Sequence, residues 1–276
     1  MPKKLTLDEI KQEEVAILDW FDSFCSDKDL NYSIAYGTLL GAVRHRGFIP
    51  WDDDIDVVMP RPDYDAFIAL AKNGGFPEDI DVQATEVDGF VQPFAKVVNK
   101  AIEVKSGRNM GGGKKEWLWI DIFPIDGVPS SKISQKILFF RAKVLATLCV
   151  ADQLDPHYDG TTLTMRAAAA IVGPFARRFD IPNYASKHLA ALCRSVPFRK
   201  GFPAAVIAWG SGVREIFPSE YFLTKKKLPF ETGCFDAPLH APEMLAQIYG
   251  DNYMELPPLK DRVSHELKAY KDNGSF

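Results

Sequence analysis

The stretch Gly47-Phe-Ile-Pro-Trp-Asp-Asp-Asp-Ile-Asp-Val-Val-Met59 places four carboxylates within five positions and runs directly into an apolar segment. Residues 55–59 predict a strand, in which alternate side chains point to the same face. Asp54 and Asp56 are therefore expected on one face, and two neighbouring carboxylates need a counter-charge. Ligands that are all oxygen suit a hard cation, so the pattern predicts a Mg²⁺ or Mn²⁺ site. The alternative is a solvated acidic loop.

A third carboxylate stands in the apolar run Trp117-Leu-Trp-Ile-Asp-Ile-Phe-Pro124. This run predicts a buried strand that Pro124 ends, and a lone buried carboxylate is costly unless it is paired or binds a metal. Asp121 beside Asp54 and Asp56 would complete a two-metal site. The alternative is an Asp that bonds to backbone or pairs with a lysine. Asp126, which precedes a glycine, is expected to form a turn.

Upstream of the acidic run, the segment 35–46 predicts a strand, a Gly37-Thr38 turn and a short helix. Free backbone N–H groups at such a helix start suit a phosphate. Arg44 and Arg46 lie between this turn and the acidic run and are candidates to clamp phosphates. Their alternative role is that of exposed charges at a helix end.

Composition narrows the class of protein further. The 276 residues include 33 Lys plus Arg and 37 Asp plus Glu, for a net charge of −4, and 46% are hydrophobic. These values are ordinary for a soluble globular protein, so they exclude a disordered chain and give no basic surplus for a nucleic-acid partner. There is no run of about 18 apolar residues to span a membrane. Four scattered cysteines without a CxxC pair, and no apolar leader, predict a cytoplasmic protein.

Three regions follow from the pattern of the chain. We expect an α/β core over 1–129, a helical region over 130–213 that shapes the acceptor side, and a C-terminal segment over 214–276 that packs back on the core. Expected helices are 6–27, 38–45, 63–72, 133–154, 164–179, 184–196 and 242–249; expected strands are 31–36, 55–59, 117–123 and 228–231, with a meander over 82–104, a mobile loop over 108–115 and a solvated turn at 225–227.

The motif Gly37-Thr-Leu-Leu-Gly41, followed by the acidic run from Arg46 to Asp56, resembles the LicD family. Its members are nucleotidyltransferase-fold enzymes that transfer phosphocholine or related phospho-alcohols to glycans. Residues 119–124 are similar to the family's third-carboxylate strand, and 230–231, 241–251 and 256–258 to its C-terminal block. The resemblance implies an α/β (α+β) fold with a nucleotidyltransferase-like mixed sheet, flanking helices and a helical subdomain.

The resemblance also implies roles for individual residues. Asp54, Asp56 and Asp121 would be catalytic and bind one or two Mg²⁺ or Mn²⁺ ions. The donor's phosphates would contact Gly37, Thr38, Arg44, Arg46 and Lys96, although Lys96 could equally be a surface lysine. Asp52 and Asp53 would orient the metal ligands. Residues of the C-terminal block with less defined roles are Glu231, Arg262 and His265.

The function so implied is transfer of a phospho-alcohol, choline first, from a CDP-alcohol to a hydroxyl of a cell-surface glycan or its lipid-linked precursor, with release of CMP. One alternative is a nucleotidyltransferase that releases pyrophosphate. Another is a non-catalytic glycan- or nucleotide-binding module, which would be expected to lack at least one of the three carboxylates. The basic and apolar segment 133–154 also suggests peripheral membrane contact at the inner face of the membrane, or else a helix buried in its own subdomain.

Overall fold

A computed structural model describes residues 2–105, 115–151, 172–262 and 267–271 of the chain. It is a mixed α/β protein, as the sequence predicts. A nine-stranded sheet has the central order β1-β11-β5-β6-β3-β2, while β4 pairs with β5 and β7 joins β6 to β8. These strands are β1 (Lys3–Lys4), β2 (Ser33–Ile34), β3 (Asp56–Pro60), β4 (Ile80–Gln83), β5 (Ala95–Val104), β6 (Glu116–Gly127), β7 (Pro203–Ala205), β8 (Phe217–Pro218) and β11 (Ala269–Lys271).

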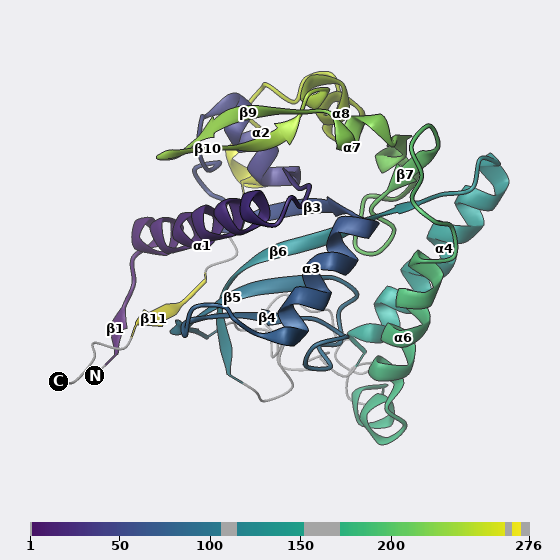
Figure 1. Ribbon diagram of the computed structural model, residues 1–276, viewed down its shortest axis with the longest axis horizontal. Helices are drawn as coiled ribbons and strands as arrows, with labels where there is room; N and C mark the ends of the chain where they lie inside the picture. The colour runs from purple at the N-terminus through teal and green to yellow at the C-terminus, as the bar shows by residue number, and fades with distance from the viewer. Residues whose placement is uncertain (1, 106–114, 152–171, 263–266, 272–276) are drawn as a thin grey trace.

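Two helices cover one face of the sheet, α1 (Leu7–Asp27) and α3 (Arg61–Asn73), as Figure 1 shows. A capping box starts α1: the Glu9 N–H donates to Thr6 Oγ1, and the Thr6 N–H donates to the Glu9 carboxylate. These helices and the sheet bury the largest hydrophobic cluster. The two central strands β3 and β6 run parallel, and every other pairing among the described strands is antiparallel.

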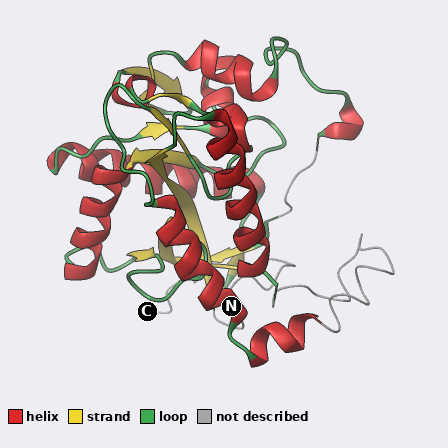
Figure 2. Cartoon of the chain, turned by 90° about the vertical axis from the view of Figure 1, so that its right-hand side faces the viewer, coloured by secondary structure: helices red, strands yellow, loops and turns green. Residues whose placement is uncertain are grey.

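The rest of the chain forms two groups around the sheet. The hairpin of β9 (Lys225–Phe230) and β10 (Gly233–Pro238) lies near α2 (Tyr36–Arg44), α7 (Glu220–Leu223) and α8 (Ala241–Tyr249) (Figure 1). On the other side, α4 (Lys132–Cys149) and α6 (Ile181–Cys193) pack against each other around a small apolar cluster of their own. That side of the molecule faces the viewer in Figure 2. Short 3-10 helices are η1 (Gly212–Glu215) and η2 (Leu259–Asp261).

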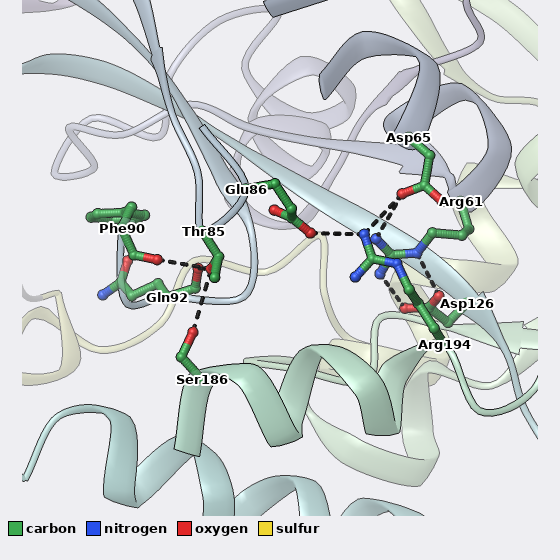
Figure 3. Close-up of polar contacts among 9 residues, drawn as sticks. All are labelled: Arg61, Asp65, Thr85, Glu86, Phe90, Gln92, Asp126, Ser186 and Arg194. Carbon is green, nitrogen blue, oxygen red and sulfur yellow. Dashed lines mark hydrogen bonds and ion pairs between the residues drawn. The ribbon is translucent and has the colours of Figure 1, made fainter. Parts of the chain in front are cut away.

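Polar contacts join the core to α6, as Figure 3 shows. Arg194, just after α6, donates to Asp65 of α3 at 3.0 Å and to Glu86 at 2.8 Å. Ser186 of α6 lies 3.3 Å from the Thr85 hydroxyl. The two ion pairs of Arg194 are exposed, so they contribute little to stability, whereas Ser186 is buried where it meets Thr85.

The expected turn at Asp126 is wrong. Asp126 is 1% exposed, lies inside β6, and accepts from Arg61 Nε and Nη2 at 2.7 Å each (Figure 3).

The β6 strand also continues past Pro124, which was expected to end it. On one side of β6, pairing with β5 stops at Ile122 and pairing with β7 starts at Asp126. Pro124 lies between them, where no neighbouring strand needs a hydrogen bond from its backbone nitrogen.

Some element boundaries differ from the predictions. The three lysines 225–227, expected in a solvated turn, belong to β9; Lys225 Nζ lies 2.6 Å from the Asp236 carboxylate, and Lys227 Nζ 2.9 Å from Asp22. The sheet also continues into β7 and β8, beyond the predicted core. The predicted loop 108–115 lies outside the described residues except for its last residue. Of the predicted helix 164–179 only residues 172–179 are described, and 172–178 are helical. None of the described helices is long and apolar enough to cross a bilayer.

Candidate active site

One row of side chains crosses the centre of the sheet. Asp56 at the start of β3 is the register partner of Asp121 in β6, and Asp121 is in turn the partner of Lys96 in β5. Residues in register on neighbouring strands project from the same face, and their Cβ atoms lie about 4.5–5.5 Å apart. Two predicted carboxylates and the predicted lysine therefore lie side by side, although they are far apart in sequence.

Lys96 is buried in this row and is not a surface lysine. It is 6% exposed, its Nζ lies 3.4 Å from Asp121 Oδ1, and the same ammonium stands 3.6 Å from the centre of the Trp119 ring. Burial lowers the pKa of Lys96, while the Asp121 carboxylate acts in the opposite direction. Burial likewise raises the pKa of Asp121, against the effect of Lys96. The pair is thus a buried cation and anion at the edge of the acidic cluster.

The carboxylates repel one another. Burial, and then the charges of Asp54 and Asp121, raise the pKa of Asp56 well above its usual range. The charge of Asp54 also raises the pKa of Asp121, so Asp54 acts on both partners in the row. Such mutual repulsion is what a bound cation relieves.

The side chains of the row are of the chemical type that suits a hard divalent cation. Asp121 Oδ1 is buried and, apart from the ion pair with Lys96, has no hydrogen-bond partner in the described part of the chain. Among the described residues, no group of three or more His, Cys, Asp and Glu side chains is arranged so that it could hold a metal ion. Carboxylate oxygens, one of them buried without a hydrogen bond, are nevertheless the kind of ligand that Mg²⁺ takes. The metal itself stays a prediction.

The first turn of α2 meets the acidic run. Thr38 is 2% exposed, and its Oγ1 accepts from the Asp56 N–H at 2.9 Å. Gly37 allows Asp52 to approach the helix, because a Cβ at Gly37 would lie 2.5 Å from Asp52 Oδ2. Thr38 therefore holds the backbone of Asp56 in place, and Asp52 lies against the helix start that was predicted to bind phosphate.

Replacing Thr38 with Val is expected to lower the free energy of unfolding by about 1–3 kcal/mol, because the buried Asp56 N–H loses its acceptor. Thr38→Ser keeps the hydroxyl and should stay close to the wild type. Urea unfolding of the three proteins measures the difference. Equal stability of Thr38→Val and Thr38→Ser would contradict this role.

Distant segments hold the ends of the acidic run. Glu231 of the C-terminal block accepts from the Phe48 N–H at 2.9 Å, and its own N–H donates to the Arg46 carbonyl at 2.9 Å. Asp53 is fully buried, and its Oδ2 accepts from the Leu267 N–H at 3.2 Å. Glu231 and Asp53 therefore make contacts that position the backbone.

The predicted arginines lie in different surroundings. Arg44 donates to the carbonyls of Tyr253 and Glu255 at 2.9 and 3.1 Å, and burial lowers its pKa. Arg262 donates to the Pro257 carbonyl at 2.9 Å, and its guanidinium lies 4.7 Å from the centre of the Trp51 ring. Both arginines thus bind the segment after α8. The Arg46 side chain is exposed, and His265 lies outside the described residues.

Sequence reasoning missed three residues beside the row. The Tyr36 hydroxyl donates to Glu215 Oε2 at 2.6 Å. Burial raises the pKa of both Tyr36 and Tyr249, and the charges of Glu215 and Asp56 act in the same direction. Tyr36 could have been found because it directly precedes Gly37-Thr38. Glu215 and Tyr249 carry no local signal, since only the fold brings them to this place.

Comparison with known proteins agrees with this geometry. The family described as LicD/FKTN/FKRP, nucleotidyltransferase domain, matches residues 29–146. The chain is 31% identical over 278 residues to the lipopolysaccharide cholinephosphotransferase LicD of Haemophilus influenzae, covering 96% of this chain and 98% of that protein. Two uncharacterized proteins, from Rickettsia prowazekii and Rickettsia typhi, are each 54% identical over 35 residues, which is 13% of this chain.

Proposed function

Because this chain belongs to the LicD/FKTN/FKRP nucleotidyltransferase family, we propose that it transfers a phospho-alcohol, phosphocholine first, from a CDP-alcohol to a hydroxyl of a lipopolysaccharide-type glycan. The chain is a LicD-like transferase of a phosphorus-containing group; the alcohol and the acceptor are what we propose. The full-length similarity to the Haemophilus influenzae enzyme carries the proposal. The Asp56–Asp121–Lys96 row supports it, because it gathers the charged groups that such a transfer needs.

The proposed mechanism is an in-line displacement at phosphorus. The acceptor hydroxyl attacks the phosphorus that bears the alcohol, its proton passes to the Asp121 carboxylate, and the bond to CMP breaks with its electrons on CMP. Asp121 stands between Asp56 and Lys96 in the row, which places its carboxylate to accept this proton. Positioning and charge stabilisation provide most of the catalysis in such reactions.

The remaining residues of the row would handle the phosphates. Asp54, Asp56 and Asp121 would hold Mg²⁺ or Mn²⁺, which when bound neutralises charge on the donor's phosphates. Lys96 would pair with a phosphate oxygen on the same side. Gly37 and Thr38, in the first turn of α2, would offer backbone N–H groups to the donor.

Replacing Lys96 with Gln is expected to lower kcat/KM for the CDP-alcohol by about 100-fold, because a buried cation that faces the developing charge is lost. Lys100→Gln is the matched control: Lys100 lies on the same strand, but its side chain is 41% exposed. Steady-state CMP release measures both variants, and thermal melting shows that both fold. Equal rates for the two variants would remove Lys96 from the proposed site.

The decisive experiment separates the possible reactions by their products. The protein is incubated with Mg²⁺, candidate glycans and CDP-choline, CDP-ethanolamine, CDP-glycerol or CDP-ribitol, and in parallel with CTP. CMP release from a CDP-alcohol supports the proposal. Pyrophosphate release from CTP with no CMP would favour a nucleotidyltransferase. No product from any donor would favour a non-catalytic binding module, although the chain keeps all three carboxylates.

The acceptor could reach the enzyme at the cytoplasmic face of a membrane, and we propose that α4 contacts anionic lipid there. Ile133, Ile137, Phe140 and Val144 are 72%, 54%, 69% and 45% exposed and follow one another at helical spacing. They lie opposite the buried face that packs on α6. The helix carries four basic residues and no acidic one, which suits a negatively charged surface.

The double substitution Ile137→Glu/Phe140→Glu is expected to weaken co-sedimentation with phosphatidylglycerol vesicles by at least about tenfold, because two apolar side chains leave the lipid interface. Leu7→Glu/Leu259→Glu is the control, since these side chains are exposed apolar residues elsewhere on the molecule. Wild-type protein that does not bind such vesicles would disprove the contact.

A further inference from the structure

A pocket opens beside the carboxylate row, between the sheet and the helices above it. Its walls come from the end of β2 and the start of α2, from β3, from η1 and β8, and from α7 and α8. Figure 1 shows α2, β3, α7 and α8 close together. Residues that matter to the argument are Tyr36, Val58, Glu215, Phe217, Met244 and Ile248. The empty volume, which includes space open to solvent, is about 410 Å³.

The pocket lies one step along the strands from the carboxylates. Val58 follows Asp56 by two residues on β3, so both side chains leave the same face of the sheet about 7 Å apart. Its register partner Phe123 stands in the same relation to Asp121 on β6. The Phe123 ring meets the Tyr36 ring edge to face, with centroids 5.7 Å apart. A group attached to a phosphate at the row can therefore extend into this pocket.

One carboxylate faces an otherwise largely apolar wall. Glu215 is 2% exposed, and its two oxygens accept hydrogen bonds from the Tyr36 hydroxyl and the Ser211 N–H. No Lys or Arg side chain pairs with it in the described part of the chain. Burial raises the pKa of Glu215, while the two hydrogen bonds act to lower it. A buried anion without a cation partner is costly, and a cationic ligand would relieve that cost.

Tyr36, which bonds Glu215, has an unusual backbone conformation. It is the first residue of α2 and adopts a φ of +46°, a conformation that is rare for an aromatic residue. Such strained residues gather at ligand-binding sites, where the surrounding contacts hold them. The same residue thus lines the pocket, bonds Glu215 and directly precedes Gly37-Thr38.

Given the proposed transferase function, on which this inference rests, we propose that this pocket receives the alcohol group of the donor and that Glu215 selects a cationic alcohol. Two aromatic residues in the lining, Tyr36 and Phe217, together with one carboxylate, are the chemistry that recognises a quaternary ammonium group. Uncharged polyols such as glycerol or ribitol would leave Glu215 unpaired and would lack partners for their hydroxyls on the apolar walls. The pocket therefore favours choline over these alcohols.

Calorimetric titration of the full chain with CDP-choline, CDP-glycerol and CMP tests this assignment. Wild-type protein should bind CDP-choline at least about tenfold more tightly than CDP-glycerol. Glu215→Gln has the same shape and should lose most of that preference while its affinity for CMP stays unchanged. In turnover assays the loss should fall on KM for CDP-choline more than on kcat. Glu243→Gln, an exposed carboxylate on α8, is the matched control and should behave as the wild type.

A second variant guards against an effect of Glu215 on folding. Ile248→Trp fills the pocket from α8 without touching the hydrogen bonds of Glu215, and it should weaken CDP-choline but not CMP. Thermal melting confirms that each variant is folded. A CDP-choline preference that both variants retain would overturn the pocket assignment and leave the transferase function standing. Wild-type protein that neither binds nor turns over any CDP-alcohol would instead overturn the proposed function, and the pocket assignment with it.

Discussion

Replacing Asp56 with Asn is expected to lower CMP release by roughly 1,000-fold while leaving the fold intact. Asp56 opens β3 and lies in register with Asp121, and the charges of Asp54 and Asp121 act on its carboxylate. Asparagine keeps the shape of the side chain but removes the negative charge that a divalent cation needs. Asp54→Asn should have the same effect, because its charge acts on both members of the pair.

Asp56→Asn should lower activity but should not lower the stability of the fold. Burial and like charges raise the pKa of Asp56 in the folded protein above its value in the unfolded chain. As the pH rises above the pKa of an ordinary aspartate, ionisation of Asp56 therefore lowers the free energy of unfolding. Asparagine removes that cost. Without divalent metal at neutral pH, Asp56→Asn should therefore melt at the same temperature as the wild type or higher.

Thermal melting with and without Mg²⁺ gives a readout that does not depend on turnover. Mg²⁺ should raise the melting temperature of the wild type by binding only the folded state, and it should not do so for Asp56→Asn. Asp65→Asn is the control, because Asp65 is a half-exposed carboxylate of α3 outside the row. Wild-type turnover by Asp56→Asn, or an undiminished Mg²⁺ effect, would remove Asp56 from the metal site.

Asp126→Asn should give the largest loss of stability, about 3–5 kcal/mol, because it leaves the Arg61 guanidinium buried without its counter-charge. Both oxygens of Asp126 bond Arg61 at 2.7 Å, and the two side chains are 1% and 9% exposed. The control is again Asp65→Asn. Asp65 lies 3.4 Å from the same arginine but is 47% exposed, so its loss should cost at most about 1 kcal/mol.

A double variant separates the charge from the packing. Arg61→Met/Asp126→Leu replaces the pair with apolar side chains of similar size and should recover most of the stability that Asp126→Asn loses. Urea unfolding at neutral pH measures all four proteins. Equal loss for Asp126→Asn and Asp65→Asn would show that burial of the pair contributes nothing.

The sequence predicts those parts of the site whose structure depends on residues that are neighbours in the chain. Asp56 and Asp121 each stand at a strand that its own apolar residues define, and a parallel pair of such strands brings them together. The helix α1 was predictable for the same reason, since its cap and apolar spacing are local.

Contacts between distant residues could not be predicted in this way. The Tyr36 hydroxyl meets Glu215 across 179 positions of the chain, and Arg61 meets Asp126 across 65. Asp126 is followed by glycine and so has the local pattern of a turn, but its position in β6 beside Arg61 decides its role. Lys96 was ambiguous because burial depends on which strands flank β5.

The acidic run is assembled from pieces of chain made at very different times. Residues 47–56 emerge early from the ribosome, yet Glu231 and Leu267 make backbone contacts with them, and β11 pairs with β5 and β1 in the sheet. The nascent chain therefore cannot complete this site until residue 271 has emerged. Thr38 and Asp121 emerge before the C-terminal segment, so what the acidic run lacks until then are its contacts with Glu231 and Leu267.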